Sequence, residues 1–215
     1  LHYNNEQLSM EGVDLVSLAQ EHGTPLFVYS QQAMLDALAD YQAGFAGRNA
    51  LICYAMKANS SLAILQTFAQ AGCGFDIVSA GELERALRAG AAPQNIIFSG
   101  VGKTATEMQR ALEVGIGCFN VESEAELNLL NQVAMRMGAV APVSLRVNPD
   151  VDAKTHPYIS TGLKGNKFGI AHDHALAAYS MAAALPGLRV VGIDCHIGSQ
   201  ITEPGPFLDL SLIHI

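Results

Sequence analysis

Lys57 is the residue whose chemistry the sequence raises first. It closes the stretch LICYAMK (51–57), in which six apolar or aromatic residues precede a single lysine. We expect this run to keep the amine out of water, and burial disfavours the charged form of an amine. A neutral amine attacks carbonyl groups, as in class I aldolases and in enzymes that use pyridoxal 5'-phosphate (PLP). The simpler alternative is a lysine that extends from a strand end into water.

His196 also ends an apolar run, and a turn of small residues follows it in the segment DCHIGSQI (194–201). The backbone amides of such a turn and the hydroxyl of Ser199 are suitable donors to a phosphate group. A histidine at the end of a strand can equally be a structural residue. The residues alone leave both interpretations open.

Arg146 lies within an apolar run, so its charge needs a buried partner. Asp76, in an earlier apolar run, is one candidate, and such a pair could serve a site or only stabilise the fold. The polar segment RVNPDVDAKTHPYISTGLKGNKFGI (146–170) follows and contains three lysines. Loops of this length usually cover a site or bind a ligand.

Two motifs resemble ligand sites but do not fit them. FSGVGKT (98–104) lacks the glycine that a P-loop needs five residues before the glycine of its GKT, because Ile97 stands there. We interpret this segment as a turn in which Thr104 caps a helix. His172 and His174 lie two apart at a predicted helix start and do not share a helical face, so we predict no metal site.

From residue 51 onward, short apolar runs alternate with amphipathic stretches that begin at Ser or Thr and end at Gly. The apolar runs are 51–56, 74–78, 95–99, 117–121, 142–147 and 189–195. Some amphipathic stretches open with the S/T-x-x-E pattern of a helix capping box. The pairs are Ser79 with Glu82, Thr104 with Glu107, and Ser123 with Glu126. We assign these glutamates no chemistry, and the alternation predicts a parallel sheet covered by helices.

A doubly wound sheet and a (β/α)8 barrel both satisfy this alternation. No G-x-G-x-x-G follows the first strand, which disfavours a dinucleotide site. Polar residues repeatedly follow the carboxyl ends of the strands, where barrels carry their active sites. They are Lys57, Asp76, Ser99, Glu122, Asn148 and His196. We predict an α/β fold, an incomplete TIM barrel with about six of eight strands. A helix is expected at 31–45, and the run 25–29 is either a further strand or part of another unit.

The composition excludes several classes of protein. Half of the 215 residues are hydrophobic and the net charge is −8, which disfavours binding to nucleic acid or to an anionic membrane. No apolar run is long enough to span a bilayer, and there is no signal-peptide pattern. The cysteines are far apart, and we expect reduced core thiols in a cytoplasmic protein. They are Cys53, Cys73, Cys118 and Cys195. Because the chain opens with Leu1 and stops at Ile215 within a predicted helix, we expect a fragment.

Six motifs, in order, closely resemble those of the diaminopimelate decarboxylases. These PLP enzymes catalyse the last step of lysine synthesis and group with ornithine and biosynthetic arginine decarboxylases. The motifs are YAMKANS (54–60), GFDIVSAGEL (74–83), FSGVGKT (98–104), FNVES (119–123), the segment 146–170 and DCHIGSQI (194–201). The resemblance implies an alanine racemase-like barrel, here residues 31–215, joined to a β-sandwich domain that includes residues 1–30.

The resemblance also implies roles for individual residues. Lys57 would hold PLP as a Schiff base, and His196 would stack on the pyridine ring. Ser199 would bind the phosphate, while Asp76 and Arg146 would line the barrel near the cofactor. The loop 149–169 would cover the site near the partner subunit of a homodimer.

Other family motifs do not occur in this sequence. E-P-G-R, G-G-G and C-E-S-G-D, which supply the pyridine, phosphate and partner-subunit contacts, are absent, and EPGP (203–206) lacks the arginine. We therefore expect the 215-residue chain alone to be poorly folded and inactive. Two other readings remain open. They are a different PLP barrel enzyme, such as an ornithine or arginine decarboxylase or a racemase, and a non-catalytic regulatory relative.

Overall fold

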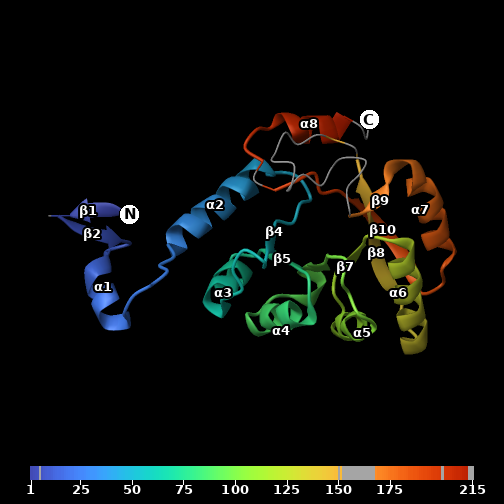
Figure 1. The fold of residues 1–215 in the computed structure, drawn as a ribbon, viewed down its shortest axis with the longest axis horizontal. Coiled ribbons are helices and arrows are strands. Elements are labelled where there is room, and N and C mark those ends of the chain that lie inside the picture. The colour runs from blue at the N-terminus through green and yellow to red at the C-terminus, as the bar shows by residue number, and fades with distance from the viewer. Residues whose placement is uncertain (5, 150, 152–167, 200, 213–215) are drawn as a thin grey trace.

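The computed structural model describes residues 1–4, 6–149, 151, 168–199 and 201–212 (Figure 1). Its main sheet has the strand order β10-β8-β7-β6-β5-β4, and all neighbours on this path are parallel. The strands are β4 Cys53–Ala55, β5 Gly74–Ile77, β6 Ile96–Phe98, β7 Cys118–Val121, β8 Ala141–Asn148 and β10 Leu188–Asp194. All six predicted apolar runs are confirmed as strands. A short strand, β9 (Ile170–Ala171), pairs with the end of β8.

Helices connect successive strands and cover one face of the sheet (Figure 1). The connecting helices are α3 Leu62–Gln70, α4 Ala80–Arg88, α5 Ala105–Val114, α6 Glu124–Met137 and α7 Ala175–Ala184, whereas α2 Gln31–Gly44 precedes β4 and α8 Gly205–Leu212 follows β10. The helix expected at 31–45 is therefore confirmed. Within the described part of the chain, no helix has the length and apolar character that crossing a membrane requires.

The predicted helix caps are only partly confirmed. Thr104 and Glu107 form the reciprocal capping box at the start of α5. Ser79 caps α4 as predicted, but the Glu82 carboxylate accepts from the amide of Val78, one residue too early for a box. Ser123 likewise caps α6, but the Glu126 carboxylate accepts from the amide of Glu122 and not from that of Ser123. The reason is the backbone. Both serine caps have φ −157°, against −87° at the threonine, so their own amides are turned differently.

The two faces of the sheet differ in character because side chains alternate along each strand. The face under the helices is apolar and fully buried. It includes Phe75, Ile77, Ile96, Phe98, Phe119, Val121, Val143 and Leu145. The residues between them face the concave side and are largely polar. They include Asp76, Ser99, Asn120, Ser144 and Arg146. The fold thus places a polar surface inside an open, partial barrel.

A small N-terminal unit lies apart from the main sheet (Figure 1). It contains the antiparallel strands β1 (His2–Asn4), β2 (Gln7–Met10) and β3 (Val13–Asp14), followed by helix α1 (Leu15–His22). Its link to the barrel includes Glu11, whose carboxylate accepts from the hydroxyl of Ser30 and, at 2.9 Å, from the amide of Gln32. That residues 1–30 belong to a β-sandwich remains a prediction.

The run 25–29 is not a strand, so the suggestion of a further strand there is wrong. Phe27 is 82% exposed and Tyr29 is 56% exposed, so the run does not bury its aromatic side chains. Among the described residues, β4 pairs only with β5 and β10 only with β8 on the sheet path, and the barrel is open at both edges. This matches the prediction of an incomplete barrel.

Candidate active site

A cavity of about 390 Å3 opens at the carboxyl ends of the strands. Its lining includes all five residues that the sequence proposed for a cofactor site. They are Lys57, Asp76, Arg146, His196 and Ser199. Ser99, Glu122, Phe168, Asp194 and Cys195 also line it. Residues from distant parts of the chain therefore meet in one polar pocket.

Lys57 lies in the turn that follows β4. The turn is held by the amide of Met56, which donates to the Asp76 carbonyl at 3.1 Å, and by the amide of Ala58, which donates to the Ala55 carbonyl at 3.1 Å. The side chain of Lys57 is exposed, so the predicted shielding of its amine from water is wrong for this chain. The cause is that β4 is an edge strand with no neighbour on its far side among the described residues.

Asp76 accepts a hydrogen bond from a serine on the next strand. The hydroxyl of Ser99 donates to Asp76 Oδ1 at 2.5 Å, and the side-chain amide of Asn120 donates to Ser99 Oγ at 3.1 Å. The result is a polar chain across the ends of β5, β6 and β7 that fixes one oxygen of Asp76. The sequence did not assign Ser99 or Asn120 a role, although Ser99 stands at a strand end, the position that marked the other site residues.

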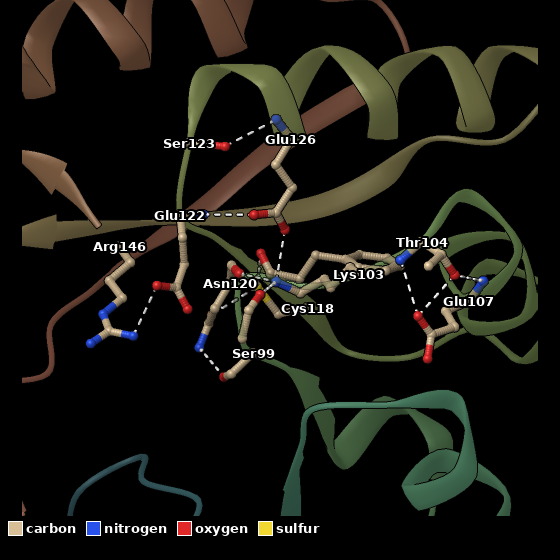
Figure 2. Close-up of polar contacts among 12 residues, drawn as sticks. Ser99, Lys103, Thr104, Glu107, Cys118, Asn120, Glu122, Ser123, Glu126 and Arg146 are labelled. Carbon is tan, nitrogen blue, oxygen red and sulfur yellow. Dashed lines mark hydrogen bonds and ion pairs between the residues drawn. The ribbon is translucent and has the colours of Figure 1, made fainter. Parts of the chain in front are cut away.

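Arg146 pairs with Glu122, and not with Asp76 as the sequence suggested. Its Nη1 lies 3.0 Å from Glu122 Oε2, and the two side chains are only 13% and 3% exposed (Figure 2). Glu122 is on the adjacent strand end, whereas β5, which carries Asp76, is separated from β8 by two strands. The ring of Phe168 covers the guanidinium, with 5.5 Å from Cζ to the ring centroid.

Lys103 is buried beside the pocket and does not line it. Its Nζ donates to the carbonyls of Gly100 at 2.5 Å and Asn120 at 2.7 Å, and to Glu126 Oε1 at 2.7 Å (Figure 2). The interpretation of FSGVGKT as a turn with a helix cap is confirmed, since Thr104 caps α5. The reading of Glu126 as a cap alone missed its ion pair with Lys103.

Burial sets the protonation of several pocket groups. It raises the pKa of Asp76, and hydrogen bonding from Ser99 opposes this shift. It likewise raises the pKa of Asp194, with Arg146 in opposition. For His196, burial lowers the pKa, and the positive charges of Arg146 and Lys57 lower it further. The pocket thus favours a neutral imidazole next to acids that hold their protons more strongly than usual.

The cysteines are unpaired, as expected. Cys73 is buried and the others are half-buried. Burial raises the pKa of Cys53 and of Cys118 to about 11, so both are protonated thiols at neutral pH. His172 and His174 lie in an exposed 3-10 turn before α7. Among the described residues, no group of three or more His, Cys, Asp or Glu side chains is placed to hold a metal ion.

Some predicted features lie outside the described residues. The proposed covering loop 149–169 falls mostly in the undescribed range 152–167, and the end of the helix predicted at the carboxyl terminus falls in the undescribed range 213–215. At the carboxyl end of this loop, Gly169 has φ +80° and a Cβ there would lie 3.0 Å from the Arg146 carbonyl. The backbone at Gly169 therefore lies directly against Arg146.

The chain matches a known family over most of its length. The model of the pyridoxal-binding domain of pyridoxal-dependent decarboxylases matches residues 31–211. The diaminopimelate decarboxylase of Pseudomonas aeruginosa is 58% identical over 207 residues, covering 96% of this chain and 50% of that protein. That of Vibrio cholerae is 58% identical over 203 residues, covering 94% of this chain and 49% of that protein. The chain spans about half the length of the curated relatives it matches.

A solved structure shows the same architecture. The crystal structure of diaminopimelate decarboxylase from Helicobacter pylori complexed with L-lysine superposes with a TM-score of 0.90 at 45% identity. The match covers 94% of this chain and 51% of that one. The partial barrel seen here therefore corresponds to about half of a longer protein chain in that relative.

Proposed function

Because the chain belongs to the pyridoxal-dependent decarboxylase family, we propose that it is the N-terminal half of a diaminopimelate decarboxylase. The whole enzyme converts meso-2,6-diaminoheptanedioate to L-lysine and CO2, the last step of lysine biosynthesis. The observation that carries this proposal is the pocket, in which Lys57 meets His196 and Ser199 although it is far from both in the chain. The high identity to diaminopimelate decarboxylases supports the choice of substrate.

The pocket residues fit PLP. An exposed primary amine, a hydroxyl in a glycine turn and an imidazole line one polar cavity, and these are suitable groups for an aldehyde, a phosphate and an aromatic ring. Lys57 would anchor the cofactor, Ser199 would bind its phosphate and His196 would contact its ring. When bound, PLP supplies an electron sink for the charge left at the substrate Cα after loss of CO2.

The other pocket residues organise charge around that position. Arg146 keeps its positive charge in place through Glu122 at 3.0 Å and the ring of Phe168. Asp76, fixed at one oxygen by Ser99, places a carboxyl group in the same pocket as Lys57. The lowered pKa of His196 keeps its ring neutral, which suits contact with an aromatic group.

We also infer a homodimer with an amino-acid substrate, located in the cytoplasm. The dimer follows from the family resemblance, in which the site forms between subunits. The relative from Helicobacter pylori binds L-lysine, an amino acid. The unpaired cysteines suit a reducing compartment.

The test uses the full-length protein, in which this chain continues into a second half like that of its relatives. It is loaded with PLP and given meso-diaminopimelate, and CO2 release and L-lysine formation are measured. We expect both products. Turnover of ornithine or arginine instead, or interconversion of amino-acid enantiomers, would assign a different PLP barrel enzyme. A colourless protein that does not take up PLP would favour the regulatory relative.

A further inference from the structure

The ammonium of Lys103 has no hydrogen-bonding capacity left for a ligand. The side chain is fully buried, and each of its three N–H bonds has an acceptor within 2.7 Å. Two acceptors are backbone carbonyls, of Gly100 after β6 and of Asn120 in β7. The third is Glu126 Oε1, whose side chain is 9% exposed.

Glu126 extends the connection to the end of β7. While Oε1 accepts from Lys103, Oε2 accepts from the backbone amide of Glu122 at 3.0 Å (Figure 2). We call Lys103 and Glu126 together the clamp. The clamp joins three backbone positions, namely the carbonyls of Gly100 and Asn120 and the amide of Glu122.

Each clamped position carries or adjoins a side chain that shapes the pocket. Gly100 follows Ser99, which donates to Asp76. Asn120 donates from its side chain to Ser99. Glu122 accepts from Arg146. Neither side chain of the clamp lines the cavity. The clamp can therefore affect the pocket only through the backbone atoms that it holds.

Stability by itself does not account for such a pair. Two buried charges lose much of their mutual attraction to desolvation, and apolar residues of the same volume often hold a fold equally well. What the charges add is geometry, since an ammonium directs its three protons to fixed acceptors. An arginine would not reproduce this, because its guanidinium is planar.

We propose that Lys103 and Glu126 are positioning residues that fix the Glu122 carboxylate and, through it, the Arg146 guanidinium in the cofactor pocket. This rests on the proposed function, since it assumes that the pocket holds PLP. Arg146 is placed correctly only while the clamp holds the end of β7.

The test is a double-mutant cycle in the full-length protein with Lys103→Met, Glu122→Gln and the double variant. Two quantities are measured for each, kcat/KM with meso-diaminopimelate and the dissociation constant for PLP with the protein free of substrate. In the wild-type background we expect K103M to worsen both quantities by about tenfold, because Arg146 would no longer be held in place. In the E122Q background we expect K103M to change both by less than about twofold. Equal losses in the two backgrounds would overturn the proposal.

Two further variants separate positioning from folding. Glu126→Gln is milder, because a glutamine cannot accept from both Lys103 and Glu122 yet keeps the shape. It should show the same dependence on Glu122, and it replaces K103M in the cycle if that variant does not fold. Val133→Ala, a buried site on α6 outside the clamp, is the control for destabilisation. It should lower the unfolding temperature and leave the PLP dissociation constant within about twofold.

The outcomes distinguish this proposal from the proposed function. If the wild-type protein binds PLP and leaves diaminopimelate unchanged, the substrate assignment fails, and the PLP dissociation constants still decide the role of the clamp. If K103R restores PLP affinity to the wild-type value, the directed geometry of the ammonium is not required and the clamp proposal is overturned.

Discussion

The guanidinium of Arg146 and the carboxylate of Glu122 meet because β7 and β8 are in register. Val121 lies opposite Leu145, and the next residue on each chain segment is one member of the pair. Both side chains face the concave side of the sheet, opposite the face that the connecting helices cover. One wall of the proposed cofactor pocket is therefore an ion pair between neighbouring strands.

Removing Glu122 should destabilise the full-length protein. In Glu122→Ala the largely buried Arg146 loses its partner, and we expect a loss of about 3 kcal/mol in the free energy of unfolding. The control is Glu84→Ala, which breaks a pair with Arg110 whose side chains are 42% and 44% exposed. There we expect a much smaller loss, because a solvent-exposed ion pair contributes little to stability. Urea unfolding measures both, and equal losses would contradict the buried pair.

Asp76 should make stability depend on pH. Its pKa is raised by burial, so the folded state holds this proton more strongly than the unfolded state does. The resulting stabilisation is fully present below the ordinary range of an aspartate and is lost as the pH rises through the raised folded-state pKa. Asp76→Asn stays neutral and still accepts from Ser99. We therefore expect D76N to gain stability relative to the wild type as the pH rises toward neutral.

Ser99→Ala provides the matched test of that account. It removes the hydrogen bond that lowers the pKa of Asp76, so this pKa should rise further and the pH window should move upward. Urea unfolding at a series of pH values follows both variants. A difference between D76N and wild type that does not vary with pH would show that Asp76 titrates alike in both states.

Gly117 should tolerate no side chain. A Cβ there would lie 2.3 Å from the Gln94 carbonyl, which belongs to the backbone and cannot rotate away. We expect Gly117→Ala to cost about 2 kcal/mol, as overpacking commonly does. The control is Gly44→Ala at the end of α2, where a Cβ meets nothing within 4 Å. Thermal unfolding should show a clear drop for G117A and little change for G44A, and the reverse order would refute the close contact.

The order of the strands and helices could be predicted from local features. Apolar runs of strand length, Ser or Thr caps and closing glycines are short-range signals, and Gly115 and Gly138 do adopt the left-handed cap conformation. The strand ends then identified the pocket, because parallel strands direct their carboxyl ends to one edge. This is why the sequence alone could place Lys57 and His196 at the same edge of the sheet.

Partners across the sheet could not be predicted in the same way. Arg146 pairs with Glu122 and not with Asp76 because β7 is the neighbour of β8. No local sequence pattern indicates which strands are neighbours. The clamp was missed because Glu126 also fits a cap and Lys103 also fits a surface turn. The exposure of Lys57 depends on what lies beyond the edge strand β4, and the run that ends in it carries no information on that neighbour.

The central claim is that the amine of Lys57 carries the cofactor. The most direct measurement is borohydride reduction of the full-length protein loaded with PLP, followed by mapping of the modified peptide, with Lys57→Ala as the control. We predict that the label is on Lys57, in the peptide that contains YAMKANS, and that it is lost in the control. A label on another lysine, or no label on the wild-type protein, would contradict the account.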